Sequence, residues 1–213
     1  MNWVDIERAA LAAAFRSYGP DAATLCTGWT TRHLLGHLVQ REHDPFANIA
    51  DQLSHPSPGE EKRLGRLVAG TRIGNGFDTL IHRFEAGPPR WSPMNWAGVQ
   101  LNLLEFVIHH EDIRRGDPDQ PQPRELSTEE NRVIFERLVF PARLSFRRAP
   151  VGVVLVSSQG DRKAVTKGTR HIELHGAPIE LALHVSGRQR AAIVELVGAP
   201  DDIVAFRSWQ QTR

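Results

Sequence analysis

The chain has 213 residues, 40% hydrophobic and 24% charged, with a formal net charge of +1. These values are ordinary for a globular protein with room for one large domain or two small ones. The balanced charge gives no electrostatic reason to expect binding to nucleic acid or to an anionic membrane. No apolar run is long enough to span a bilayer, and the N-terminus lacks the segments of a signal peptide. We therefore expect a cytoplasmic protein.

The single cysteine, Cys26, limits the chemistry that the chain can carry. It excludes an intrachain disulfide and a zinc site built from several thiolates. Cys26 precedes the second expected helix, and we interpret it as an inert buried thiol. No Gly-rich phosphate loop with its lysine is present, so nucleotide binding has no support.

Helical periodicity extends over the chain to about residue 145. Prolines and glycines mark its breaks, most clearly at Pro45 in the second helix and at Gly74-Asn-Gly76 in the third. Asn95 is expected to cap the fourth helix, and Pro141 to end the fifth. The expected helices are Asn2–Ser17, Thr30–Leu53, Glu60–Ala86, Asn95–Arg115 and Ser127–Phe140.

The pattern changes at Pro150, after which β-branched and alternating segments indicate strands. Two helices are expected among them. The expected elements are strands at Val151–Val156, Lys163–Thr166, His171–His175 and Ala191–Val197, and helices at Pro178–His184 and Asp201–Gln210. The sequence thus predicts an α+β protein, with a helical domain over residues 1–145 and a small α/β domain over 146–213.

The fourth helix carries polar side chains within its apolar face. Glu105 and His109 are four residues apart, so their side chains converge on one side of the helix. His37 lies in the apolar stripe of the second helix, which an up-down bundle would make a neighbour. Two imidazoles and one carboxylate form a zinc ligand set that leaves positions for water or substrate. The spacing leaves a second interpretation equally open, in which each histidine is a core residue bonded to a carbonyl or carboxylate.

Two further residues are candidates for roles beside this set. Asp112, one turn beyond His109, is suited to orient an imidazole, but equally to pair with the arginines at the end of the helix. His33 precedes His37 by four residues, so it is either a further ligand or a polar residue of the first helical turn. His43 and His110 lie off the inner face, and we expect them in solvent.

Two segments carry motifs that resemble a known family. Gly28–Leu38 (GWTTRHLLGHL) and Glu105–Arg115 (EFVIHHEDIRR) resemble the two metal motifs of the mycothiol-dependent maleylpyruvate isomerase and DinB-like superfamily. The second motif is similar to that of an actinobacterial branch described only as metal-binding. Gly176–Arg188 and Val197–Asp202 resemble turns of the family's C-terminal domain, so the resemblance covers nearly the whole chain. His33 departs from the family pattern, which more often has an acidic residue there.

The resemblance implies a DinB-like four-helix bundle followed by a small α/β domain that is similar to sterol-carrier-like folds. It implies a divalent metal, zinc before nickel or iron, with His37, Glu105 and His109 as ligands and with Asp112 and His33 in the surrounding shell. Relatives bind the small thiol mycothiol at the open positions, because a dication lowers the pKa of a thiol. The implied activity is that of an isomerase or S-transferase acting on an electrophilic small molecule.

Other functions remain open at this stage. The chain is alternatively a non-catalytic module, in which the metal is structural or the α/β part holds a small apolar ligand. A closed four-ligand metal site would favour that alternative over catalysis. A third possibility, a regulatory partner of another protein, has no supporting feature in the sequence.

Overall fold

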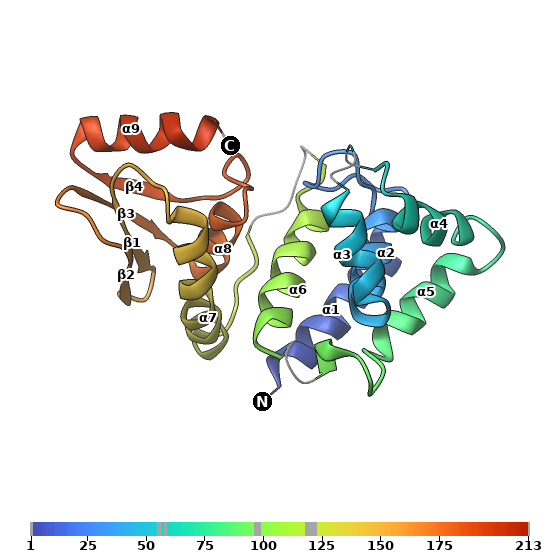
Figure 1. The fold of residues 1–213 in the computed structure, drawn as a ribbon. Helices are drawn as coiled ribbons and strands as arrows, with labels where there is room; N and C mark the ends of the chain where they lie inside the picture. The colour runs from blue at the N-terminus through green and yellow to red at the C-terminus, as the bar shows by residue number, and fades with distance from the viewer. Residues whose placement is uncertain (1, 55–56, 58, 96–98, 118–122, 213) are drawn as a thin grey trace. The chain divides into compact units, whose positions relative to one another are not determined.

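The structure is a computed structural model that describes residues 2–212 except 55–56, 58, 96–98 and 118–122. The chain divides into two compact units, residues 1–123 and 124–213. The first unit is helical, whereas the second combines helices with a β-sheet (Figure 1). The predicted α+β class is therefore confirmed. None of the described helices has both the length and the hydrophobicity that a membrane span requires.

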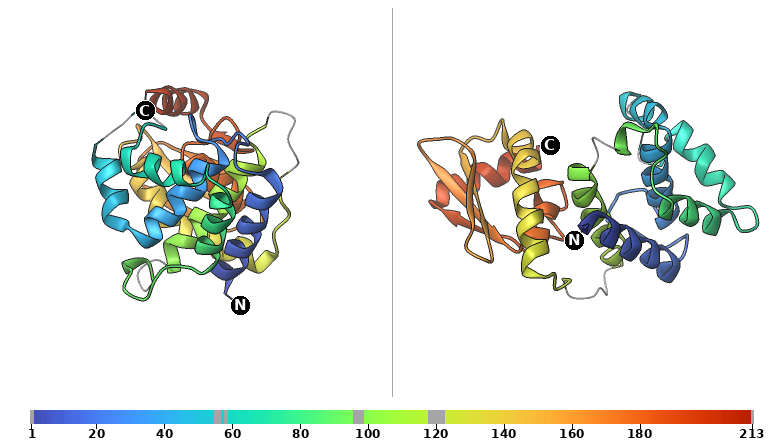
Figure 2. Two further views of the ribbon diagram at one scale, coloured as in Figure 1. Left: turned by 90° about the vertical axis from the view of Figure 1, so that its right-hand side faces the viewer. Right: turned by 90° about the horizontal axis from the view of Figure 1, so that it is seen from below.

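The helical unit follows the predicted breaks. Asp44 ends the second predicted helix and starts a new one, where its carboxylate accepts a hydrogen bond from the Ala47 amide at 3.0 Å. α1 packs against α5 and α6, and α2 packs against α3, α4 and α5 (Figure 2). The elements are α1 (Trp3–Tyr18), α2 (Thr31–His43), α3 (Pro45–Leu53), α4 (Lys62–Gly70), α5 (Gly76–Glu85), η1 (Pro93–Asn95) and α6 (Val99–Arg114). Asn95, expected to cap the fourth helix, is instead the last residue of η1.

The second unit is built on a four-stranded sheet in the order β2-β1-β3-β4. β1 pairs antiparallel with β2 and parallel with β3, which pairs antiparallel with β4. α7 lies beside β2, α8 beside β1 and β3, and α9 beside β3 and β4. The elements are α7 (Thr128–Phe146), β1 (Gly152–Ser157), β2 (Arg162–Thr166), β3 (His171–Gly176), α8 (Pro178–Val185), β4 (Glu195–Gly198) and α9 (Pro200–Gln211).

The two units divide before α7, whereas we expected the boundary after it, at residue 145. It packs against α8 and β2, so it belongs to the second unit. Ser127 caps it as predicted, but the helix continues through Pro141 to Phe146. Proline removes one backbone hydrogen bond from a helix. The buried side chains of Leu138, Ala142 and Phe146 continue the apolar face past it, and their burial outweighs that loss.

A buried ion pair joins α1 to α2 in the core of the helical unit. Arg8 donates two hydrogen bonds to the Glu42 carboxylate, at 2.6 and 2.8 Å, and a third to the Phe84 carbonyl at 2.7 Å. Its guanidinium also lies 4.9 and 4.8 Å from the ring centroids of Phe84 and Phe106. Glu42 is fully buried, so the pair fixes the packing of two helices that carry or support the candidate site.

A buried histidine should make the second unit sensitive to acid. His184 is 5% exposed, and burial lowers its pKa to about 4. Its Nε2 accepts a hydrogen bond from the Gln210 side-chain amide at 3.0 Å, so the neutral ring carries its proton on Nδ1. Between pH 6.5 and 4 the unfolded chain binds a proton that the folded unit does not. Stability is therefore expected to fall by up to about 3 kcal/mol as the pH drops through this window.

Hydrogen exchange of the β1 and β3 amides would measure this loss within the second unit. His184→Gln should flatten the pH dependence, whereas His171→Gln, at an exposed position of β3, should preserve it. The same slope in wild type and His184→Gln would show that His184 is not responsible.

Candidate metal centre

The structure brings together the three residues predicted as metal ligands. His37 projects from α2, and Glu105 and His109 project from consecutive turns of α6. One donor atom from each of the three lies within 4.8 Å of the other two. The rings of His37 and His109 are 5.6 Å apart between centroids and nearly perpendicular, at 76°. The helical spacing and the stripe on α2 therefore predicted the proximity of these residues.

His109 lies between two carboxylates of its own helix. Its Nε2 is 3.3 Å from Glu105, one turn before it, and its Nδ1 is 2.8 Å from Asp112, almost one turn after it. Asp112 is fully buried, and it lies on the side of the ring away from Glu105. With the Nδ1 proton held by Asp112, a neutral His109 directs the lone pair of Nε2 toward Glu105 and His37.

The electrostatics of the cluster favour a positive charge at this point. Burial lowers the pKa of His109, but hydrogen bonds with Asp112, Cys26 and Glu105 outweigh it and hold that pKa well above its ordinary value. Burial raises the pKa of Glu105, but His109, Arg41 and His37 more than reverse the effect and lower it. Glu105 is therefore a carboxylate at neutral pH. The imidazolium of His109 balances the negative charges of the Glu105 and Asp112 carboxylates, and a dication would balance them in the same way.

Cys26 lies closer to this cluster than we expected. Its Sγ donates to Asp112 Oδ2 at 3.2 Å, and Cys26, Asp112 and His109 form a second group of donor atoms within 4.8 Å. The Leu25 amide donates to the Asp112 carbonyl at 3.0 Å, which holds the loop against the end of α6. The expectation that Cys26 is buried is wrong, because the side chain is only partly buried and contacts a carboxylate, whereas its inertness stays a prediction.

Gly116 explains how the loop approaches α6 so closely. A Cβ atom at this position would lie 2.0 Å from the Ala23 carbonyl oxygen and 2.7 Å from Thr24 Cα. Any larger residue would therefore displace the segment that leads to Cys26. The sequence marks Gly116 as a helix end, but its close contact with the loop depends on the tertiary fold.

His37 is also covered by an aromatic side chain. Trp29, in the turn before α2, has its ring centroid 5.2 Å from that of His37. The Trp29 indole donates to Glu61 at 3.2 Å, and Glu61 is the residue that precedes α4. This contact fixes the indole over the imidazole and limits the directions from which a ligand can reach it.

The other predicted candidates have separate roles. His33 takes part in the N-terminal capping box of α2, where its Nδ1 lies 3.3 Å from the Thr30 amide nitrogen and 3.0 Å from its hydroxyl. It belongs to neither donor group among the described residues. Arg114 and Arg115 contact Glu111, at 2.9 and 2.7 Å, and Asp112 contacts His109.

The expectation that His110 lies in solvent is wrong. The residue is 8% exposed, and its Nδ1 lies 3.6 Å from the Glu7 carboxylate of α1. α1 covers this side of α6, so both sides of the helix are buried. His43 is likewise only partly exposed, and it lines a separate cavity beside α2.

Comparisons with known proteins bear on the first domain and on the fold. Residues 5–90 match the family model of the mycothiol maleylpyruvate isomerase N-terminal domain, a region that contains His37 but ends before α6. The fold is similar to two crystal structures, of the mycothiol-dependent maleylpyruvate isomerase and of a histidine-to-alanine mutant of it. Each gives a TM-score of 0.56 at 14% identity, over 91% of this chain and 90% of the other.

No curated protein matches the sequence closely enough to add a further comparison. The domain match rests on the sequence and the fold likeness on the coordinates. Both indicate the same group of proteins. Residues 5–90 of the chain are therefore similar in sequence to the mycothiol maleylpyruvate isomerase N-terminal domain, and the chain is similar in fold to that enzyme.

Proposed function

We propose that the chain binds a divalent metal ion through His37, Glu105 and His109 and acts as a mycothiol-dependent isomerase or S-transferase. The observation that carries the proposal is the meeting of these three donors, with Asp112 orienting the central imidazole. The DinB-like bundle predicted from the sequence carries its two metal motifs on separate helices. The proposed ligands likewise come from two helices that are distant in the chain, α2 and α6.

The donor set fits zinc. Zinc at a site with two histidines and one carboxylate has bonds of about 2.0–2.2 Å, so its donor atoms lie roughly 3.3 Å apart. Side-chain rotation would bring the present donors to that separation from within 4.8 Å. Nickel and iron(II) also accept imidazole and carboxylate ligands, so the donor types favour zinc without excluding them.

Each residue has a defined task in this proposal. Asp112 holds the Nδ1 proton of His109, Glu105 supplies the negative charge, and Trp29 restricts access to His37. A dication held there would lower the pKa of a small thiol, so that the thiolate exists at neutral pH. We propose mycothiol as the thiol and an electrophilic small molecule as the second substrate. A cytoplasmic location stays a prediction.

Asparagine at position 112 should weaken the site without removing a ligand. Asp112→Asn keeps the size of the side chain but loses the charge that fixes the His109 tautomer. Loss of such an orienting partner lowers metal affinity by about 10- to 100-fold. Competition with a chromophoric chelator would measure the zinc affinity of purified wild type and variant.

Asp51→Asn provides a matched control for this experiment. Asp51 is also a buried carboxylate of the helical unit, but it binds the Leu64 amide and the Gln40 side chain. Its substitution should reduce stability and leave zinc affinity unchanged. Equal affinities of wild type and Asp112→Asn would contradict the orienting role.

Thiol consumption tests the catalytic part of the proposal. Protein purified without a histidine tag would be assayed with mycothiol and an electrophile such as maleylpyruvate, before and after treatment with a chelator. We expect turnover that disappears on chelation and returns with zinc. Turnover that survives complete metal removal would disprove metal dependence.

The alternative proposal is a non-catalytic module that binds a metal or a small apolar ligand. Cys26 supports it, since its thiol forms a second donor group with Asp112 and His109, which could hold a structural metal apart from the first group. Stoichiometric metal with no thiol consumption would favour this module over the enzyme. The likeness of the second unit to sterol-carrier-like folds remains a prediction, which binding of a fluorescent fatty acid would test.

A further inference from the structure

A cavity of about 650 Å³ lies in the helical unit, between α2, α3, α4 and α5. Its lining includes Val39, Gln40 and His43 of α2 and Phe46 and Ala47 of α3, and none of the lining residues belongs to either donor group of the metal centre. The volume lies within the range of small-molecule sites, which is roughly 300–1,000 Å³. The cavity is therefore a second place where the chain can hold a ligand.

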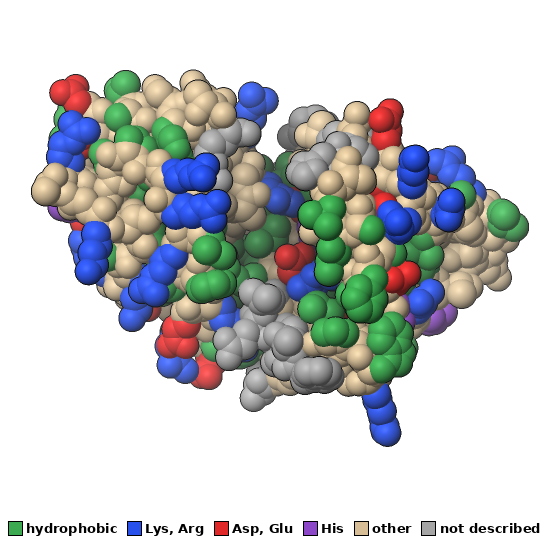
Figure 3. Space-filling model, in the orientation of Figure 1, with side chains coloured by type: hydrophobic (Ala, Val, Ile, Leu, Met, Phe, Trp, Pro, Cys, Tyr) green, Lys and Arg blue, Asp and Glu red, His purple; other side chains and the backbone are tan. Residues whose placement is uncertain are grey.

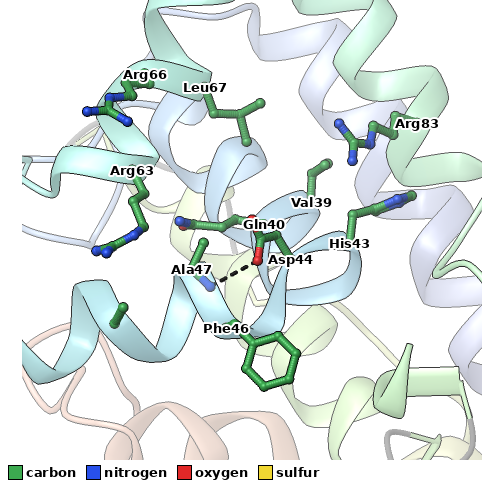
Figure 4. Close-up of a pocket in the computed structure, with 11 residues that line it drawn as sticks. Val39, Gln40, His43, Asp44, Phe46, Ala47, Arg63, Arg66, Leu67 and Arg83 are labelled. Atoms are coloured by element: carbon green, nitrogen blue, oxygen red, sulfur yellow. Dashed lines mark hydrogen bonds between the residues drawn. The ribbon is translucent and has the colours of Figure 1, made fainter. Parts of the chain in front are cut away.

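Three arginines line this cavity. Arg63 and Arg66 come from α4 and lie along one side, and Arg83 of α5 lies across from them beside His43 (Figure 4). All three side chains are exposed, so water screens their mutual repulsion and their donors stay accessible to an anion. A carboxylate or phosphate head group matches the planar, forked donors of arginine.

The carboxylates near the cavity do not neutralise this charge. Asp51 lies 3.4 Å from Arg63, but it already accepts hydrogen bonds from the Leu64 amide and from Gln40, both at 3.0 Å. The Asp44 carboxylate caps α3 (Figure 4). Among the described residues, Arg66 and Arg83 have no carboxylate within ion-pair distance. At least two positive charges therefore remain for a ligand.

Apolar side chains form another part of the lining. Phe46 of α3 is 77% exposed, and Leu67 of α4 lies on another side of the same cavity. Hydrophobic side chains also gather on the surface over α3 (Figure 3). A cavity with an exposed aromatic ring at one end and arginines at the other suits a ligand with an apolar ring and a charged group (Figure 4).

We propose that this cavity binds a small organic anion with a head group of two negative charges and an apolar ring. An aryl phosphate and an aromatic dicarboxylate share this chemistry. The head group contacts Arg83, whose guanidinium points inward, and the ring contacts Phe46 at the rim (Figure 4). Arg66 and Arg63 reach the head group by rotation of their exposed side chains. The proposal is independent of the metal centre, whose ligands lie on a different part of α2 and on α6.

Calorimetric titration of the full chain with phenyl phosphate tests the proposal for aryl phosphates. The same titration with phthalate tests it for aromatic dicarboxylates. Inorganic phosphate and phenol, the separate halves of the first probe, should each bind at least 10-fold more weakly than phenyl phosphate. Affinity should fall as the salt concentration rises, since charge attraction contributes to binding. The titrations use the His37→Ala variant beside wild type, so that binding of phosphate to a metal ion is recognised. Equal affinities in the two place the probe away from the metal centre.

Substitutions assign the binding to the cavity. Arg66→Gln and Arg83→Gln should each weaken phenyl phosphate binding about 10-fold or more, because each removes a charged hydrogen-bond donor. Phe46→Ala should weaken phenyl phosphate while leaving inorganic phosphate unchanged. Arg72→Gln is the matched control, since Arg72 is also exposed in the helical unit and does not line the cavity.

His43 supplies a second measurement within the cavity. Burial and the charges of Arg83 and Arg8 lower its pKa, and Glu42 opposes them. A bound anion should raise that pKa, as followed by the histidine ring resonances. The proposal is overturned if neither phenyl phosphate nor phthalate binds at millimolar concentration, if Arg72→Gln weakens binding as much as Arg66→Gln and Arg83→Gln, or if His37→Ala abolishes it.

Discussion

Glu42→Gln is expected to destabilise the helical unit by about 3–5 kcal/mol, which is typical when one partner of a buried ion pair is removed. Arg8 would keep its charge in the core, where it is 8% exposed, with the Phe84 carbonyl as its remaining strong acceptor in the described contacts. The neutral glutamine side chain offers Arg8 one hydrogen-bond acceptor but carries no negative charge. Hydrogen exchange of α1 and α2 amides would report the loss within this unit.

Two comparisons make this prediction specific. Glu85→Gln breaks the similarly forked pair between Arg16 and Glu85, whose side chains are 42% and 35% exposed, and should cost at most about 1 kcal/mol. The double variant Arg8→Met with Glu42→Leu replaces both charges by apolar groups, and it should be more stable than either single variant. Similar losses for Glu42→Gln and Glu85→Gln would show that burial does not determine the effect.

The sequence predicted those features that depend on local periodicity. Glu105 and His109 converge because one helical turn separates them, and this spacing is visible without any structure. His37 could be placed on the inner face of its helix by the same rule. The breaks at Pro45 and at Gly74–Gly76 follow from residues that cannot continue a regular helix, and the structure has them as predicted.

Contacts between distant segments could not be predicted in this way. Cys26 and Asp112 are 86 residues apart, and they meet because Gly116 lets the Ala23 carbonyl approach the end of α6. His110 lies on the side of α6 that the pattern assigns to solvent, but α1 covers it and places Glu7 beside it. A single helix pattern does not show how many of its sides have neighbours.

The boundary between the units was misplaced for a related reason. α7 has the same periodicity as the helices before it, so its sequence does not reveal which unit it packs against. Its buried face contacts α8 and β2, elements that follow it in the chain. Propensity alone predicted a helix end at Pro141, and tertiary packing of Ala142 and Phe146 overrode it.

His37→Ala is expected to abolish stoichiometric metal binding, whereas Cys26→Ser should leave it intact. The structure contains two donor groups that share His109, one with His37 and Glu105 and the other with Cys26 and Asp112. They use opposite nitrogens of the same ring, Nε2 in the first group and Nδ1 in the second. Asp112 holds the Nδ1 side at 2.8 Å, so the first group is the one whose imidazole nitrogen is open to a metal.

Elemental analysis of protein purified without a histidine tag separates the two groups. The loss of one of three protein ligands should exceed the roughly 10- to 100-fold effect of losing an orienting partner, so His37→Ala should retain no metal through purification. His33→Ala is the matched control, because His33 lies on the same helix and belongs to the capping box of α2. Metal retained by His37→Ala but lost from Cys26→Ser would place the ion at the Nδ1 side, with Cys26 and Asp112 as its ligands.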